Sequence, residues 1–201
     1  MKIGEARQLY SGKIHEYQNQ KRSLSMQKKE LEEKIKLTEN GKEVYADEAV
    51  SLELSYEAVS KKYDEYHNYM EQLMEMHSAY ANLESTKQQT EAMKEEAQDL
   101  AKIMEVARRI AKGAKVPGKD EQKLMEYSME MYQAARSMAM MNEQKEKYKS
   151  LWKDDEAPKE NPDPREVADG HEAPAGEPEV QNVSDTMAAA AASAGVTAEQ
   201  G

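Results

Sequence analysis

The chain has 201 residues, a formal net charge of −11, one Trp, and neither Cys nor Phe. A globular domain of this length buries a thick aliphatic and aromatic interior, whereas here 33% of the residues are charged and the mean hydropathy is −0.99. The composition therefore argues against a compact globule. The lack of Cys excludes disulfide scaffolds, thiolate metal sites and cysteine nucleophiles.

Apolar residues form no long uninterrupted run. The first residues, Met1-Lys2-Ile3-Gly4-Glu5, lack the apolar stretch of a signal peptide, and the sequence holds no apolar stretch of 18 residues. We therefore expect a soluble, cytoplasmic protein.

The negative charge is concentrated at the C-terminal end. Residues 153–201 carry 3 basic and 12 acidic residues, whereas residues 1–152 carry 25 basic and 27 acidic ones. A nearly neutral body with an acidic tail does not favour binding to nucleic acid or to an anionic membrane. The sequence predicts neither as a partner.

Gly and Pro divide the chain into three long segments and a tail. Gly12 is followed by no Gly or Pro until Gly41, the next is Gly113, and most prolines lie at or beyond Pro158. This spacing predicts helices over about residues 3–38, 44–112 and 119–152. Residues 153–201 are then a disordered, acidic, Pro- and Ala-rich tail.

Apolar residues recur every seven positions in the first two predicted helices, which is typical of a narrow seam between supercoiled helices. In the first helix one row is apolar and the other is interrupted by two lysines. These rows are Ile3, Tyr10, Tyr17, Leu24 and Leu31, and Ile14, Lys21, Lys28 and Ile35.

The second predicted helix carries two rows of the same kind. They are Tyr45, Leu52, Val59, Tyr66, Leu73 and Tyr80, and Ala49, Tyr56, Tyr63, Met70 and His77. The pattern resumes further along at Met93, Ala97, Leu100, Met104, Ala107 and Ala111.

The third predicted helix continues the spacing of three and four residues. Its expected seam is Leu124, Tyr127, Met131, Ala134, Met138, Met141, Tyr148 and Trp152. The three helices together predict an all-α fold of elongated, antiparallel, coiled-coil-like hairpins placed end to end. A kink near Gln88-Gln89-Thr90 would instead fold them into a four-helix bundle.

The tail contains one stretch with high helix propensity. Residues 180–194 include an alanine run after Ser184 or Asp185, either of which could cap a helix. The stretch is either a short docking helix or an alanine-rich end of low complexity.

Residues with catalytic or metal-binding chemistry are sparse. The pair Asp64 and His67 has half of the ligand spacing used in di-metal helical bundles, but no second copy accompanies it. Neither a nucleophile motif nor a phosphate-binding loop occurs. The sequence therefore predicts no enzyme and no cofactor, with a metal-binding bundle as a remote alternative.

Two surfaces are candidates for binding a protein partner. Met125, Met129 and Met140 lie off the predicted seam of the third helix and could present an adaptable apolar face. Basic residues surround the turn before that helix and could meet an acidic partner. The basic candidates are Arg108, Arg109, Lys112 and Lys115.

The general form, an acidic helical chain with a disordered end, is similar to phage scaffolding proteins and to coiled-coil adaptors and chaperones of bacterial secretion or flagellar assembly. The resemblance is one of composition. We expect a non-enzymatic scaffold or adaptor that acts through helix–helix contacts as a homo-oligomer or with a helical partner. The alternative is a chaperone-like protein that shields a partner's helix with its Met-rich third helix.

Overall fold

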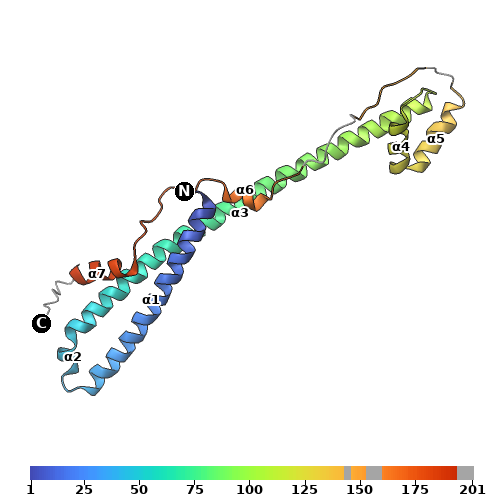
Figure 1. Cartoon of the computed structure of the whole chain (residues 1–201). Helices are drawn as coiled ribbons and strands as arrows, with labels where there is room; N and C mark the ends of the chain where they lie inside the picture. Colours follow the sequence, from blue (N-terminus) through green and yellow to red (C-terminus); the bar gives the residue numbers. More distant parts are fainter. Residues whose placement is uncertain (143–145, 153–159, 194–201) are drawn as a thin grey trace. The chain divides into compact units, whose positions relative to one another are not determined.

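The computed structural model describes residues 1–142, 146–152 and 160–193 (Figure 1). In these ranges every regular element beyond two isolated bridges is an α-helix, so the all-α prediction is confirmed. None of the described helices is both long and apolar enough to cross a membrane. The chain forms two compact units, which divide after Asn82 and again before Asp163.

The first unit is built on two antiparallel helices. Helix α1 (Ile3–Leu37) packs against the first part of α3 (Ala46–Ala111), and the four-residue α2 (Gly41–Val44) lies in the connection (Figure 1). The ring of Tyr10, near the start of α1, contacts the ring of Tyr69 in α3. Further along α1, Lys28 forms an ion pair with Glu53, which lies near the start of α3.

The turn between these helices depends on two residues that tolerate unusual backbone geometry. Asn40 has a left-handed backbone with φ of 55°. At Gly41 a Cβ atom would collide with the carbonyl oxygen of Ile35. Asn and Gly tolerate such geometry better than other residues, which explains why the first helix ends before them.

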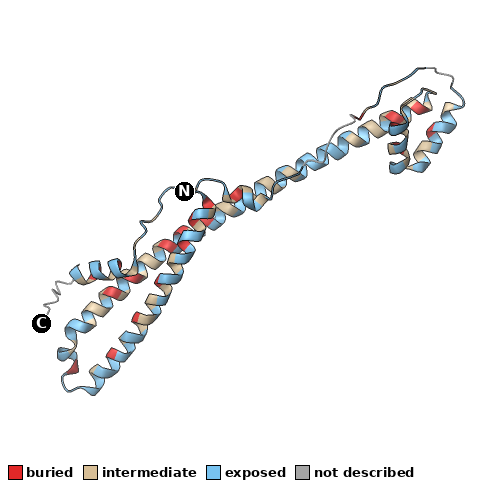
Figure 2. Cartoon of the chain, viewed as in Figure 1, coloured by how far each residue is buried: buried red, intermediate tan, exposed pale blue. Residues whose placement is uncertain are grey.

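The predicted seven-residue rows lie in the interior of the first unit (Figure 2). The whole first row of α1 is buried, and both rows of α3 between positions 45 and 80 are buried or half-buried. The core of this unit contains Ile3, Ala6, Tyr10, Tyr17, Leu24, Val59, Tyr66, Tyr69 and Leu73.

In the second unit, the end of α3 packs with α4 (Gly118–Tyr127) and α5 (Met129–Ala139). Gly113, with φ of 81°, ends α3 in a Schellman motif, in which its N–H donates to Ile110 O at 2.8 Å and Ala114 N–H to Arg109 O at 3.1 Å. The core of this unit contains Val106, Ile110, Leu124, Ala135 and Trp152.

The prediction of one third helix over 119–152 is wrong. The backbone at Ser128 is extended, and its hydroxyl accepts the Met131 N–H at 3.1 Å, so Ser128 caps a new helix instead of continuing the old one. The chain leaves α5 after Ala139, and Lys147 pairs with Lys115 in an isolated bridge. Four members of the expected seam are consequently exposed: Tyr127, Ala134, Met138 and Met141.

The prediction of a disordered tail is wrong for its described part, residues 160–193. Residues 163–193, which we call the strap, contain α6 (Pro164–Asp169) and α7 (Val183–Ser193) and belong to the first unit. Figure 1 shows the strap returning along α1 and α3. Of the two interpretations of residues 180–194, the docking helix holds over Val183–Ser193. Residues 153–159 and 194–201 lie outside the described part.

Candidate functional site

A row of apolar side chains on α3 belongs to neither core of the described part of the chain. Residues 91–98 are all exposed, and α3 contributes nothing to either core between Tyr80 and Ile103. Yet the helix keeps a heptad-like pattern of apolar residues there. We call these residues the open stripe: Leu83, Met93, Ala97, Leu100 and Met104.

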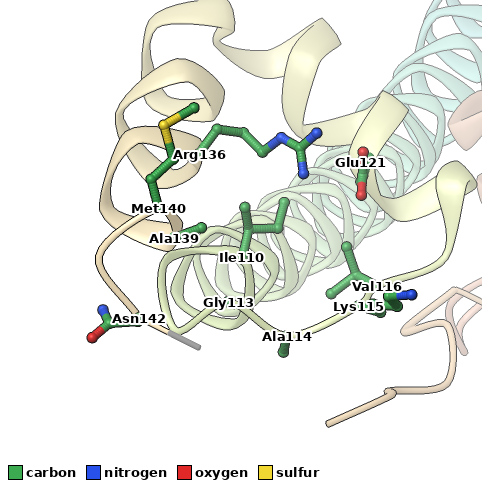
Figure 3. Close-up of a pocket in the computed structure, with 10 residues that line it drawn as sticks. All are labelled: Ile110, Gly113, Ala114, Lys115, Val116, Glu121, Arg136, Ala139, Met140 and Asn142. Carbon is green, nitrogen blue, oxygen red and sulfur yellow. The ribbon is translucent and has the colours of Figure 1, made fainter. Parts of the chain in front are cut away.

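A pocket of about 820 Å³ lies where α3, its following loop, α4 and α5 meet (Figure 3). Ile110 and Val116 supply apolar side chains to it, and Met140, 88% exposed, stands at its edge. Such a concave, partly apolar surface with a flexible thioether at its edge can accept the apolar side of a partner helix.

Polar groups of both signs line the same pocket. Arg136 extends across it towards Glu121, as Figure 3 shows. The Tyr132 hydroxyl donates to Glu121 Oε2 at 3.2 Å, and the Asn142 amide donates to Ala111 O at 3.1 Å, close to the end of α3. The pocket therefore combines an apolar lining with groups that can orient a ligand.

The structure brings two of the predicted partner-binding residues to this pocket. Met140 and Lys115 both line it. Met129 is half exposed at the first position of α5, and Met125 is half-buried on α4, but neither contributes to the pocket. Lys112 is exposed and is likewise not part of the lining.

The predicted basic patch is partly neutralised by the protein itself. Arg108 donates to both carboxylate oxygens of Glu105, at 2.7 and 2.9 Å, and Arg109 donates to Oε1 at 2.9 Å. The hydrogen bonds from Arg108 and then from Arg109 lower the pKa of Glu105 to about 2. The Arg109 guanidinium also lies 4.3 Å from the ring centre of Tyr148, so these arginines organise the end of α3.

A second candidate site is a row of four buried tyrosines between α1 and α3. Their rings belong to the core of the first unit, whereas their hydroxyl groups reach the strap. We call Tyr10, Tyr17, Tyr66 and Tyr69 the tyrosine row.

Hydroxyl groups of the tyrosine row bind mainly the backbone of the strap. The Tyr10 hydroxyl donates to Pro178 O at 2.7 Å, and that of Tyr69 donates to Pro174 O at 3.0 Å. The Tyr66 hydroxyl donates to the carbonyl of Glu179 at 3.0 Å and accepts the N–H of Gln181 at 2.9 Å. The hydroxyls of Tyr17 and Thr186 lie 2.6 Å apart.

The end of this contact near the start of α1 adds an ion pair, a ring stack and a backbone hydrogen bond. Asp169 Oδ1 lies 2.9 Å from Arg7 Nη1 and 3.3 Å from His77 Nε2. His77 Nε2 is buried and has no hydrogen-bond partner among the described residues. His171 stacks on Tyr80 with ring centres 3.8 Å apart, and its carbonyl accepts the N–H of residue 3 at 2.9 Å.

The sequence pattern placed Tyr10, Tyr17 and Tyr66 in a seam, did not single out Tyr69, and gave no sign of the second role of the four. The available signal was the residue type, because a buried tyrosine hydroxyl needs a hydrogen-bond partner that an apolar seam does not supply. Arg136 and Asn142, which line the pocket, were also missed, and their positions depend on the break at Ser128.

For metal chemistry, the described residues contain no group of three or more His, Asp or Glu side chains that could hold an ion. His67 Nδ1 lies 3.7 Å from Glu71, and His77 faces Asp169. Comparison of the chain with protein-family models, curated proteins and solved structures finds no match in any of the three. Function is therefore inferred from the open stripe, the pocket beside α5 and the tyrosine row.

Proposed function

We propose that this chain is a non-enzymatic structural or assembly protein that acts through helix–helix contacts, and that the open stripe is its association surface. The observation that supports the proposal is the exposure of this stripe. Met93 is 69% exposed and Met104 50%, although their spacing is that of a coiled-coil seam.

The energetics of a lone helix support the same proposal. A helix with no buried face depends on backbone propensity, and helix formation in water is then marginal. Pairing the open stripe with another helix would bury several large apolar side chains, each worth about 1.5–3 kcal/mol when fully buried. The stretch of α3 from residue 89 to 98, which is exposed throughout, would therefore gain most of its stability from association.

The partner for the open stripe is the same stripe of a second copy. The stripe is narrow and follows the spacing of four, three and four residues from Met93 to Met104, which suits a two-stranded seam. The positions beside it carry both signs of charge, with Lys94 on one side and Glu96 on the other. The flanks of the stripe therefore carry no run of one sign that would repel a second copy.

The experiment compares the mass in solution of two double variants by sedimentation equilibrium. Met93→Lys with Leu100→Lys places two charges in the stripe, and Ala92→Lys with Gln98→Lys places the same charges on other exposed faces of the helix. We expect the wild type and the second variant to associate at tens of micromolar, about the scale of a weak contact, and the first to be monomeric. A wild type that is monomeric there contradicts the proposal.

A second candidate function is a chaperone-like role that shields a partner's helix. The pocket beside α5 favours it, because Met140 is exposed at the edge of an apolar lining and Arg136 crosses it. Changing Met140 to Lys should then weaken protection of an added amphipathic helical peptide and leave self-association intact. Unchanged peptide binding in that variant would exclude this role.

A further inference from the structure

We propose that the α1–α3 pair binds an amphipathic helix of another protein in a groove that the strap leaves uncovered, and that opposite charges on the two sides of this groove select the partner. The partner helix would carry an apolar stripe with acidic residues along one side and basic residues along the other. This site lies in the first unit and does not use the open stripe.

Over the middle of α1, the strap covers one flank of the α1–α3 pair. It contacts α1 there through Lys13, Tyr17 and Gln20, which share one side of the helix because they are four and three residues apart. Gln18 and Lys21 each follow one of these residues and so lie about 100° further round the helix. They line a hollow that contains no residue of the strap.

Two hollows follow one another along this uncovered flank. One, of about 580 Å³, has Tyr56 and Tyr63 of α3 in its lining, and the other, of about 590 Å³, has Ile14 of α1 and Met70 of α3. Together their linings extend along α1 over residues 4–26, which is about 33 Å of helix. We call the two hollows the α1–α3 groove, and its length suits several turns of a third helix.

Charged residues follow both sides of the α1–α3 groove at a spacing of seven residues. The basic row on α1 is Arg22, Lys29 and Lys36, and the acidic row on α3 is Glu57, Asp64 and Glu71. All six residues are exposed. In coiled coils, charges beside an apolar seam set the choice and the direction of the partner helix.

The chain itself leaves these charges unused. Among the described residues, no member of either row forms an ion pair with a Lys, Arg, Asp or Glu side chain, and Glu71 has only His67 Nδ1 at 3.7 Å. Within the groove, Lys21 Nζ lies 5.1 Å from the ring centre of Tyr63 and 5.9 Å from that of Tyr56. The groove therefore offers cations on its α1 side and anions on its α3 side to an incoming helix.

A third helix with complementary charges fits this surface better than an acidic segment does. It would cover the side chains of Met26 and Met74, which are 59% and 47% exposed. The strap contains one Arg and seven Asp or Glu residues, so it has no basic row to face the acidic row of α3. An apolar stripe between rows of opposite charge answers both sides of the groove.

Two labelled peptides, added to the full-length chain and followed by fluorescence anisotropy, test the proposal. Both are helical, with about three heptads, Leu in the apolar stripe and equal numbers of Glu and Lys. In the first peptide all Glu residues lie on one side of the stripe and all Lys residues on the other, whereas in the second the two alternate along each side. We expect the first peptide to bind several-fold more tightly.

Charge-reversal variants show whether the peptide uses the α1–α3 groove. Arg22→Glu with Lys29→Glu should weaken binding of the first peptide several-fold, and so should Glu57→Lys with Asp64→Lys. Combining the four changes exchanges the signs of the two rows, and binding should recover because the peptide can then lie in the opposite direction.

The matched control is Lys34→Glu with Lys42→Glu, which makes the same change of charge at exposed positions outside the groove lining. It should leave binding of the first peptide unchanged. Equal binding of the two peptides, or an equal loss in the control and in Arg22→Glu with Lys29→Glu, would overturn the proposal.

Sedimentation equilibrium without peptide separates a foreign partner from a second copy. If Arg22→Glu with Lys29→Glu lowers the mass of the protein in solution, a second copy occupies the groove and the proposal of a foreign partner is wrong. Met93→Lys with Leu100→Lys, which charges the open stripe, should leave binding of the first peptide intact. The proposals for the groove and for the open stripe can therefore fail independently.

Discussion

Tyrosine occupies seam positions where an ordinary coiled coil would place aliphatic residues. Tyr10, Tyr17 and Tyr66 are fully buried, and each ends in a polar group that needs a partner. The strap supplies these partners through its carbonyls and through Thr186. At this scale one residue type couples the packing of α1 against α3 to the docking of a distant segment.

Changing Tyr66 to Phe should keep the packing of its ring and remove two hydrogen bonds to the strap. We expect the free energy of unfolding of the first unit to fall by about 1–3 kcal/mol, because each hydrogen bond contributes about 0.5–1.5 kcal/mol. Chemical denaturation measures this loss. Tyr56→Phe, on the same helix beside Lys28, is the control and should change little; an equal loss in both variants would contradict the role of the row.

Alkaline pH should release the strap. Burial, the largest cause, raises the pKa of Tyr17 to about 12 and also raises the pKa of Tyr10 and Tyr69. Because the folded state holds these protons more tightly than the unfolded chain, their stabilising effect is complete below pH 10. It is lost as the pH rises from 10 towards 12.

Limited proteolysis of the strap across this pH range checks the prediction. Cleavage should accelerate between pH 10 and 12 in the wild type. A Tyr17→Phe variant, which has no proton to lose at this position, should show a smaller acceleration. Identical profiles for the two proteins would show that ionisation of Tyr17 does not govern docking.

At the scale of elements, the sequence predicts the first hairpin well and the region after Gly118 poorly. The first row of α1 and the row of α3 from Leu52 to Tyr80 repeat without interruption, and Asn40, Gly41 and Gly113 mark the turns by their backbone freedom. In the third segment the spacing of apolar residues also continues, but Ser128 interrupts the backbone. The spacing of apolar residues gives no sign of a single capping serine inside an otherwise helical segment. The seam predicted for residues 119–152 is therefore wrong beyond Ser128.

Ser128→Ala tests this explanation at the junction of α4 and α5. Loss of the hydroxyl that accepts the Met131 N–H should destabilise the second unit by about 1 kcal/mol. Ser137→Ala, in the exposed interior of α5, should be neutral or slightly stabilising since Ala is the better helix former. Thermal unfolding of both variants gives the comparison, and a neutral Ser128→Ala would mean that the cap does not define the break.

The strap could not be predicted from its own composition. Acidic, Pro-rich segments that bury little apolar surface are ordinarily disordered. What orders this one is a set of hydroxyl groups more than 100 residues away in the sequence, such as Tyr66, whose hydroxyl meets the carbonyl of Glu179. Local helix propensity predicts α7, but the docking of the strap depends on hydrogen bonds to these distant hydroxyl groups.

At the scale of the whole molecule, two compact units each have a core, and α3 contributes residues to both. In the second unit, on the part of α3 that precedes its core residues, the open stripe presents Met93, Leu100 and Met104 to solvent. A protein that acts by association needs an apolar surface that its own fold leaves uncovered. The open stripe meets this requirement, which makes it the centre of the proposed function.

Amide hydrogen exchange of residues 83–104, measured as a function of protein concentration, tests that function most directly. A lone helix opens readily, so these amides should exchange fast in dilute solution. We predict that protection rises between about 1 and about 100 µM, the range of weak protein association, while residues 10–24 in the first core stay equally protected throughout. Fast exchange of residues 83–104 that does not change with concentration would contradict assembly through the open stripe.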